Sequence, residues 1–140
     1  MNTGERIVGK NEDISYQSVE EFFEQRGNNH LKHKYNYVIY LDDSPEVAML
    51  RDKQAKQLVG EKLHVEEGMT VLDIGCGIGR WGEWFCPQGV SYIGIDGSPK
   101  MIERAQDNLA AFDKKELIAG DARNLYNICE HLGGAQDMEV

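Results

Sequence analysis

Long hydrophobic runs and cysteines are both scarce in this chain of 140 residues. No apolar segment is long enough to cross a bilayer, and no secretory signal or transit peptide is visible, so we expect no membrane partner. The three cysteines, Cys76, Cys86 and Cys129, are odd in number and are not spaced as zinc ligands. This cysteine usage predicts reduced thiols, a cytoplasmic location and no metal site.

Positive charge is also scarce. The 15 basic residues face 24 acidic ones, which gives a net charge of −9, and the pI is near 4.9. Such a chain repels phosphate backbones unless a local basic patch intervenes. The basic cluster from His30 to Lys34 holds only two lysines, and we interpret it as a solvated loop. The composition therefore predicts one domain with a buried core and no nucleic-acid partner.

The most informative stretch runs from Thr70 to Arg80. It opens with an apolar, largely β-branched run over 71–74, as a strand buried on both faces requires, and it ends in a glycine turn. Gly75, Gly77 and Gly79 lack a Cβ, so the chain can turn with positive φ and a ligand can approach the backbone. A helix is expected to follow, with free N–H groups directed at the same place. Taken alone, the motif is equally a glycine turn that joins a strand to a helix.

Two acidic residues follow at intervals that fit a ligand site. A second strand is predicted over Val90–Ile95, and it ends in Asp96, twenty-one positions after Gly75. An acid at that position can hold a ribose diol by two charge-assisted hydrogen bonds. A third strand is predicted over Glu116–Ala119, and Asp121 follows it. Asp121 fits either a ligand contact or a turn residue that bonds its own backbone.

Gly-x-Gly-x-Gly with Asp73 two positions before its first glycine resembles the first motif of the class I S-adenosylmethionine-dependent methyltransferases. The resemblance implies that Asp73 lies near the cofactor's ammonium group, that Asp121 accepts a hydrogen bond from the adenine amino group, and that Met101 rests on adenine. Cys76 lies inside the loop, and we expect it to pack rather than to act as a nucleophile. No catalytic residue is assigned. The cofactor-binding residues expected from the resemblance are Asp73, Gly75, Cys76, Gly77, Gly79, Asp96, Gly97, Ser98, Met101, Asp121 and Ala122.

The predicted fold class is α/β, a Rossmann-like parallel sheet with an N-terminal helical lid. We expect residues 1–64 to form the lid or cap region and residues 65–140 to form the cofactor-binding half of the domain. The resemblance implies a seven-stranded sheet in the order 3-2-1-4-5-7-6, of which this chain supplies strands one to three and is truncated at the fourth, near Met138–Val140. The first strand would then expose an unpaired edge. The missing strands are expected from the rest of a longer chain, a partner chain or a swapped copy.

Helices are predicted on both sides of the glycine motif. In the lid, a helix over Ile14–Arg26 and a second from a cap at Ser44 to Gly60 or Leu63 are indicated by apolar periodicity and by capping residues. The polar terminus Met1–Asp13 is expected to be mobile. The helices predicted after the glycine loop cover Arg80–Phe85, Pro99–Phe112 and Leu125–Leu132.

The second lid helix has an apolar face and a charged face, and the lid tyrosines allow two interpretations. Periodicity groups the apolar residues of this helix on one face and its charged residues on another. The first face holds Val47, Leu50, Gln54, Leu58 and Val59, and the second holds Arg51, Asp52, Lys53 and Lys56. The lid tyrosines could line an acceptor pocket or cover the cofactor, or they could be core residues with a solvated hydroxyl. These tyrosines are Tyr35, Tyr37 and Tyr40.

The function implied by the resemblance is methyl transfer from S-adenosylmethionine to a small-molecule acceptor, with S-adenosylhomocysteine as product. The chain would supply the cofactor-binding half and is expected to be inactive by itself. One alternative is a noncatalytic S-adenosylmethionine-binding module or partner subunit. A nicotinamide oxidoreductase is a second alternative. The dinucleotide motif has glycine at its first, third and sixth positions, and when Gly75 is the first position this chain has Arg80 at the sixth.

Overall fold

A computed structural model describes residues 15–28, 33–38 and 44–131 of the chain. The segment expected to be mobile, Met1–Asp13, lies outside the described residues, as do Tyr40 and the expected start of a fourth strand at Met138–Val140. None of the helices in these ranges has the length and hydrophobicity needed to cross a membrane.

A three-stranded parallel sheet forms the centre of the structure, in the order β1-β2-β3. The strands are β1 at Thr70–Ile74, β2 at Ser91–Asp96 and β3 at Lys115–Ala119. In the register of the sheet, Asp73 lies beside Gly94, and Ile74 lies beside Ile95. Each predicted strand is thus confirmed to within one residue at either end, and the order agrees with the predicted sequence 3-2-1.

Short helices connect the strands, because parallel neighbours require a crossover. Between β1 and β2 lie α3 (Gly82–Phe85) and the 3-10 turn η2 (Cys86–Gln88). Between β2 and β3 lies α4 (Pro99–Asn108). Both α3 and α4 are shorter than predicted, and Leu109 leaves the helix while remaining fully buried in the core.

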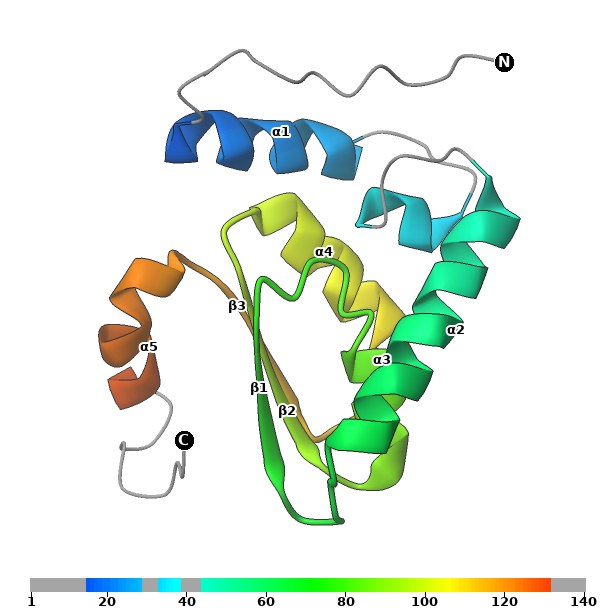
Figure 1. The fold of residues 1–140 in the computed structure, drawn as a ribbon. Coiled ribbons are helices and arrows are strands. Elements are labelled where there is room, and N and C mark those ends of the chain that lie inside the picture. The colour runs from blue at the N-terminus through cyan, green and yellow to red at the C-terminus, as the bar shows by residue number, and fades with distance from the viewer. Residues whose placement is uncertain (1–14, 29–32, 39–43, 132–140) are drawn as a thin grey trace.

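The N-terminal region forms helices of which α1 lies beside the carboxyl ends of the strands, while α2 runs along the side of the sheet (Figure 1). It comprises α1 (Tyr16–Asn28), the 3-10 turn η1 (Lys34–Tyr37) and α2 (Pro45–Lys62). Ser44 caps α2, since its hydroxyl accepts a hydrogen bond from the Val47 N–H at 3.4 Å. Figure 1 shows α1 across the end of the sheet at which α4 begins, and α1 contacts α4. After β3 the chain continues through η3 (Ala122–Asn124) and α5 (Leu125–His131).

The core lies on the face of the sheet that α3 and α4 cover. Side chains alternate between the two faces of a strand, so the register places Val71, Tyr92 and Leu117 on this face. They pack with buried residues from the connecting helices, among them Phe85 and Leu109.

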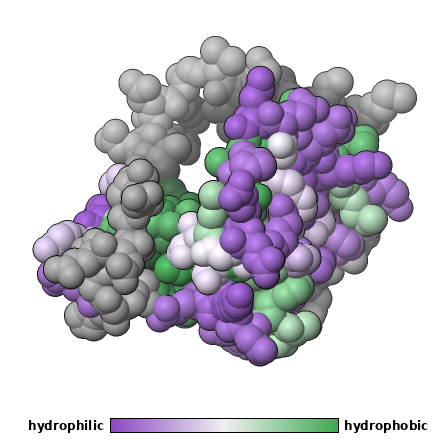
Figure 2. All heavy atoms as spheres, turned by 90° about the horizontal axis from the view of Figure 1, so that it is seen from below, coloured by the Kyte–Doolittle hydropathy of each residue, from purple (hydrophilic) through white to green (hydrophobic). Residues whose placement is uncertain are grey.

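The opposite face and the outer edge of the sheet are more exposed in the described part of the chain. Ile74 at the end of β1 is 51% exposed, and among the described residues no strand pairs with the outer edge of β1. Seen from below, hydrophobic residues gather toward the α5 side of the molecule, whereas the α2 side is mainly hydrophilic (Figure 2). The predicted apolar edge on the first strand is therefore present among the described residues.

The apolar face predicted for α2 does not face the core. Leu50 and Leu58 are 54% and 63% exposed, whereas Ala48 and Asp52 are buried. The charged face turns inward because Asp52 finds two cationic partners, Arg80 and Lys56. Apolar periodicity does not predict such partners, since Arg80 lies in a distant part of the sequence.

Candidate cofactor-binding site

The glycine loop after β1 folds back over the end of β2. Gly75, Gly77 and Gly79 all have positive φ, at 78°, 54° and 77°, so each adopts a conformation that L side chains rarely accept. The N–H groups of Gly75 and Cys76 both donate to the carbonyl oxygen of Ile95, at 2.7 and 3.0 Å. The loop is therefore fixed to the neighbouring strand next to Asp96, as the prediction of a ligand site at this edge requires.

Asp96 joins this loop to the start of α4. One carboxylate oxygen of Asp96 accepts a hydrogen bond from the Gly77 N–H at 2.8 Å, and the other accepts one from the Ser98 N–H at 2.9 Å. A carboxylate offers about four acceptor positions, so two of them remain for a ligand. The predicted ribose contact of Asp96 is compatible with these bonds and stays a prediction.

Asp73 lies on the other side of the glycine loop and is held by a phenol. The hydroxyl of Tyr92 donates to one oxygen of Asp73 at 2.6 Å. Burial raises the pKa of the Asp73 carboxyl, while the Tyr92 hydrogen bond and the charge of Arg80 act in the opposite direction, and Asp96 adds to the rise. Two carboxylates thus flank the loop, Asp73 at the end of β1 and Asp96 at the end of β2.

The third predicted contact has a different environment. The carboxylate of Asp121 accepts hydrogen bonds from the backbone N–H of Arg123 at 2.8 Å and from the Arg123 guanidinium. This ion pair holds the pKa of Asp121 below its ordinary range, and the backbone bond makes Asp121 the cap of η3, which begins at Ala122. The turn interpretation of Asp121 is therefore observed, and its contact with adenine stays a prediction.

Ser98 and Met101 are both buried at the start of α4. Ser98 caps the helix, because its hydroxyl accepts a hydrogen bond from the Met101 N–H at 3.2 Å, and it also donates to Glu24 of α1. Met101 is fully buried and packs with Tyr37 and Ile78. Its predicted contact with adenine stays a prediction. Tyr37 is a core residue, which is one of the two interpretations proposed for the lid tyrosines.

Cys76 and Gly97 are two further loop positions of the predicted site. Cys76 is 4% exposed and belongs to the core cluster, and burial raises the pKa of its thiol well above its ordinary value. This environment agrees with a packing role. A Cβ built on Gly97 would lie 3.8 Å from Glu20, so α1 passes close to the loop that follows β2.

The lid touches the glycine loop directly. A Cβ built on Gly77 would lie 2.5 Å from Cγ1 of Val38, the residue that follows η1. Arg26 of α1 donates to the carbonyl oxygens of Asn36 and Tyr37, at 3.1 and 3.0 Å from its Nε, and so fixes η1 to α1. The N-terminal region is therefore packed on the cofactor loop.

A network of buried ion pairs holds α2 against the same loop, and the sequence analysis missed it. Asp52 is 6% exposed and pairs with Arg80 and with Lys56, each at 2.8 Å. Glu83 of α3 accepts a hydrogen bond from the Tyr35 hydroxyl at 2.7 Å. The i,i+4 spacing of Asp52 and Lys56 was the one available signal, but such a spacing more often marks a solvated helix face.

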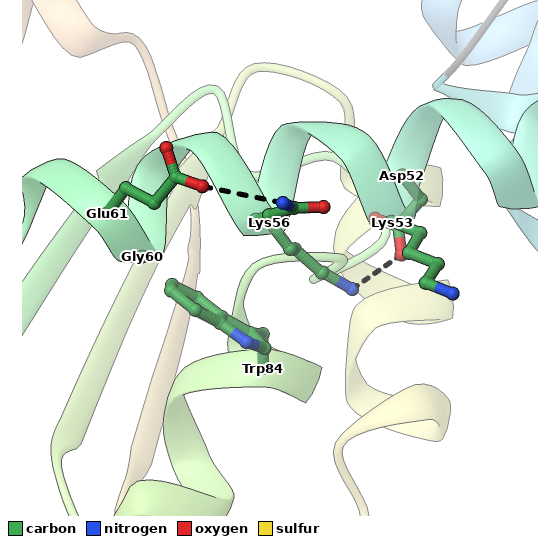
Figure 3. A pocket seen from close by; sticks show the side chains of 7 residues that line it. Asp52, Lys53, Lys56, Gly60, Glu61 and Trp84 are labelled. Atoms are coloured by element: carbon green, nitrogen blue, oxygen red, sulfur yellow. Dashed lines mark hydrogen bonds and ion pairs between the residues drawn. The ribbon is translucent and has the colours of Figure 1, made fainter.

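A groove lies beside this network, between α2 and α3, and has a volume of about 500 Å³. In Figure 3 the ring of Trp84 faces α2 near Gly60, and Lys56 extends toward Asp52. The groove lies on the flank of the lid, and the predicted cofactor residues do not line it.

The comparisons with known proteins agree with this geometry. Residues 71–131 match the family described as "Methyltransferase domain". The tRNA (uracil(54)-C(5))-methyltransferase of Pyrococcus horikoshii is 31% identical over 106 residues, which are 76% of this chain and 25% of that protein.

Two solved structures have a similar fold. Phosphoethanolamine N-methyltransferase 1 of Haemonchus contortus, in complex with phosphoethanolamine and S-adenosylhomocysteine, matches with a TM-score of 0.61 at 19% identity over 78% of this chain and 23% of that chain. N-methyltransferase NodS of Bradyrhizobium japonicum, in complex with S-adenosylhomocysteine, matches with a TM-score of 0.54 at 25% identity over 74% of this chain and 47% of that chain. This chain therefore spans about a quarter of the tRNA methyltransferase and less than half of NodS.

These relatives correct the predicted partners. The exclusion of nucleic acid is wrong, because a similar protein is named for methylation of tRNA and others are named 18S rRNA (guanine-N(7))-methyltransferase. The net charge of −9 is a sum over all residues, whereas phosphate contacts need only a local group of cations. The charge of this chain therefore excludes no acceptor class.

The sequence motif, the parallel sheet and the family match lead to the same assignment. The predicted fold class, a Rossmann-like α/β sheet, is confirmed, and so is the prediction of a methyltransferase enzyme family that uses S-adenosylmethionine. The resemblance to the class I S-adenosylmethionine-dependent methyltransferases is confirmed, because residues 71–131 match the methyltransferase domain and the fold is that of solved methyltransferases with bound S-adenosylhomocysteine.

Proposed function

We propose that this chain binds S-adenosylmethionine at the carboxyl ends of β1 and β2, and that it supplies the cofactor-binding half of an enzyme that methylates an acceptor. Residues 65–140 would form that half, and residues 1–64 the lid above it. The observation that carries the proposal is the position of Asp96, whose carboxylate closes the glycine loop through the Gly77 N–H at 2.8 Å. Its remaining acceptor positions suit the two hydroxyls of a ribose.

The charge at the loop supports a cationic cofactor rather than a dinucleotide. The charge of Asp96 raises the pKa of Asp73. Asp73 lies at the end of β1, beside the glycine loop where a dinucleotide would place its anionic pyrophosphate, whereas Asp96 could hold a ribose in either cofactor. Arg80, the cation whose field reaches Asp73, is already paired with Asp52 at 2.8 Å. The carboxylate of Asp73 in this position favours an ammonium or sulfonium group and disfavours phosphate.

The protein's task in such a reaction is alignment. When bound, S-adenosylmethionine supplies a methyl group that its sulfonium charge has already activated. The glycine loop, Asp73 and Asp96 would fix the donor, and the lid that Val38 packs on Gly77 would exclude water from it. Catalysis would then come from proximity and orientation of donor and acceptor.

Calorimetric titration of the chain with S-adenosylhomocysteine and, separately, with NAD tests the proposal. We expect saturable binding of S-adenosylhomocysteine and no binding of NAD. The Asp96→Ala variant should lose about 1.5 to 3 kcal/mol of binding free energy, as for a hydrogen bond to a charged group. Glu116→Ala is the matched control, since Glu116 is an exposed acid on β3 and its removal should leave the affinity unchanged. Equal affinities of the two variants, or tighter binding of NAD, would contradict the proposal.

The acceptor is the second part of the test. Similar proteins are named for methylation of tRNA, of 18S rRNA and of a sterol. An acceptor screen with labelled S-adenosylmethionine should therefore offer structured RNA and small molecules side by side. A chain that binds S-adenosylhomocysteine but methylates none of them would favour the alternative of a noncatalytic cofactor-binding module.

A further inference from the structure

Tyr92 is a buried core residue with one polar atom, and that atom is directed at the candidate site. The side chain is 1% exposed, and its hydroxyl donates to one oxygen of Asp73 at 2.6 Å. The two residues lie on adjacent strands, where Tyr92 is paired with Val71 and Asp73 with Gly94. The hydroxyl thus reaches the carboxylate along the face of the sheet that the core covers.

We infer that Tyr92 is a positioning residue, whose hydroxyl holds one oxygen of Asp73 so that the other oxygen is presented to the ammonium group of the bound cofactor. The inference rests on the proposed function, because it concerns the methionine end of S-adenosylmethionine. It goes beyond it by assigning a role to a residue that touches no ligand.

The ring of Tyr92 is held so firmly that its hydroxyl has a fixed position. A Cβ built on Gly82 would lie 2.8 Å from Cε1 of Tyr92, which shows how closely the start of α3 approaches the ring. Leu109 of the fully buried core belongs to the same cluster. A tyrosine packed in this way cannot rotate toward water, so its hydroxyl defines the orientation of the carboxylate that accepts from it.

The second oxygen of Asp73 is the one left for a ligand. Within the described residues the hydroxyl of Tyr92 is the hydrogen-bond partner of Asp73, and it occupies one oxygen only. Arg80 is attracted to the same carboxylate through its charge, but its guanidinium bonds to Asp52. The donor on the first oxygen of Asp73 is neutral, so the carboxylate has no hydrogen-bonded cationic partner among the described residues.

The titration of Asp73 provides a readout that simple packing would not move. Burial and the charge of Asp96 raise the pKa of Asp73, while the Tyr92 hydrogen bond and Arg80 lower it. The thiol of Cys76, which also faces this carboxylate, is buried and has a raised pKa, so it stays neutral. Loss of the Tyr92 hydroxyl should therefore raise the pKa of Asp73 further. An ammonium contact needs ionised Asp73. As the pH is lowered, the variant should therefore begin to lose affinity for the ligand at a higher pH than the unaltered chain.

The test compares two ligands on the full chain. Tyr92→Phe keeps the ring and removes only the hydroxyl. S-Adenosylhomocysteine carries the amino-acid group, whereas 5′-methylthioadenosine has the same adenosine and thioether without it. We expect Tyr92→Phe to weaken S-adenosylhomocysteine about tenfold, as for one hydrogen bond at a charged group, and to leave 5′-methylthioadenosine unchanged. The pH below which S-adenosylhomocysteine affinity declines should move upward in the variant.

Asp73→Asn is the second variant, which keeps an acceptor for the Tyr92 hydroxyl and removes the charge. It should show the same selective loss of S-adenosylhomocysteine, and it keeps the inference testable if Tyr92→Phe does not fold. An equal loss of both ligands in either variant, or no loss of S-adenosylhomocysteine, would overturn the inference. Failure of the unaltered chain to bind either ligand would instead overturn the proposed function.

Discussion

The carboxylates at the glycine loop and the carboxylate of Asp52 in the lid differ in the groups that bind them. Asp73 and Asp96 are held by neutral donors, the Tyr92 hydroxyl and two backbone N–H groups. Asp52, in the lid, is paired with cationic Arg80 and Lys56. The proposed function assigns the carboxylates with neutral donors to the ligand, whereas the carboxylate paired with cations holds α2 against the loop.

The two regions are also coupled. Arg80 ends the glycine motif and is the partner of Asp52 on α2, and Val38 of the lid contacts Gly77 within the loop. The lid therefore contacts the loop, and the proposed function assigns recognition of a cation to the acids beside it. The next three experiments probe this division between a region that stabilises and a region that binds.

The largest effect is expected in the lid. Asp52→Ala leaves Arg80 and Lys56 as poorly compensated, mostly buried cations, with side chains 17% and 14% exposed. The free energy of unfolding should fall by about 3 to 5 kcal/mol, as when one partner of a buried pair is removed. Urea denaturation measures it.

A matched control for this experiment is Glu66→Ala. Glu66 pairs with His64 on the surface, where the side chains are 65% and 83% exposed, and exposed pairs contribute little. We expect a change within about 0.5 kcal/mol for Glu66→Ala. Similar losses of stability in Asp52→Ala and Glu66→Ala would show that the ion pairs of Asp52 stabilise the fold no more than an exposed pair does.

An intermediate effect is expected where the lid meets the loop. Gly75→Ala and Gly77→Ala both place a Cβ at positive φ, which costs about 1 to 2 kcal/mol. At Gly75 no atom lies within 4 Å of the added Cβ, whereas at Gly77 it meets Val38 at 2.5 Å. Gly77→Ala should therefore destabilise the chain more than Gly75→Ala in urea denaturation.

The excess at Gly77 can be assigned to the lid by a second substitution. Val38→Ala removes Cγ1, the atom that an added Cβ at Gly77 would meet. Combined with Gly77→Ala, it should restore the part of the stability that exceeds the loss in Gly75→Ala. If Val38→Ala restores nothing, the lid does not press on the loop in solution as it does in the structure.

The smallest effect is expected at Asp121. Its carboxylate already accepts from Arg123, so a contact with the adenine amino group would add one shared hydrogen bond. Asp121→Ala should weaken the binding of S-adenosylhomocysteine less than Asp96→Ala does, because a shared hydrogen bond at a solvated carboxylate contributes little. If calorimetry shows that Asp121→Ala loses as much binding free energy as Asp96→Ala, Asp121 contributes as much to binding as the proposed ribose contact.

Local sequence signals predicted much of the fold. The strands at 71–74, 90–95 and 116–119 were found within one residue, because short apolar runs ended by glycine or acid are typical of buried parallel strands. Ser44 and Ser98 cap their helices as predicted. The length of α4 and the inward face of α2 were predicted less well, since tertiary contacts decide both.

The candidate site divides in the same way. The glycine motif and the acid twenty-one positions after Gly75 indicated a site at the ends of β1 and β2 from spacing alone. The Tyr92 hydroxyl on Asp73 and the bond from Gly77 to Asp96 link residues nineteen positions apart, and no spacing rule predicts which oxygen each donor takes. The sequence allowed Asp121 to be a ligand contact or a turn residue. The structure shows the hydrogen bond of a turn, in which Asp121 accepts from the Arg123 N–H.

By itself the sequence determined the family, the parallel strands and the position of the glycine loop, because each depends on residues within a short segment. Only the tertiary structure decided that Asp52 is buried against Arg80, that Val38 presses on Gly77 and that Tyr92 orients Asp73. These contacts join residues that are distant in the chain. Their free energy depends on burial and on partner geometry, which a hydropathy pattern does not record.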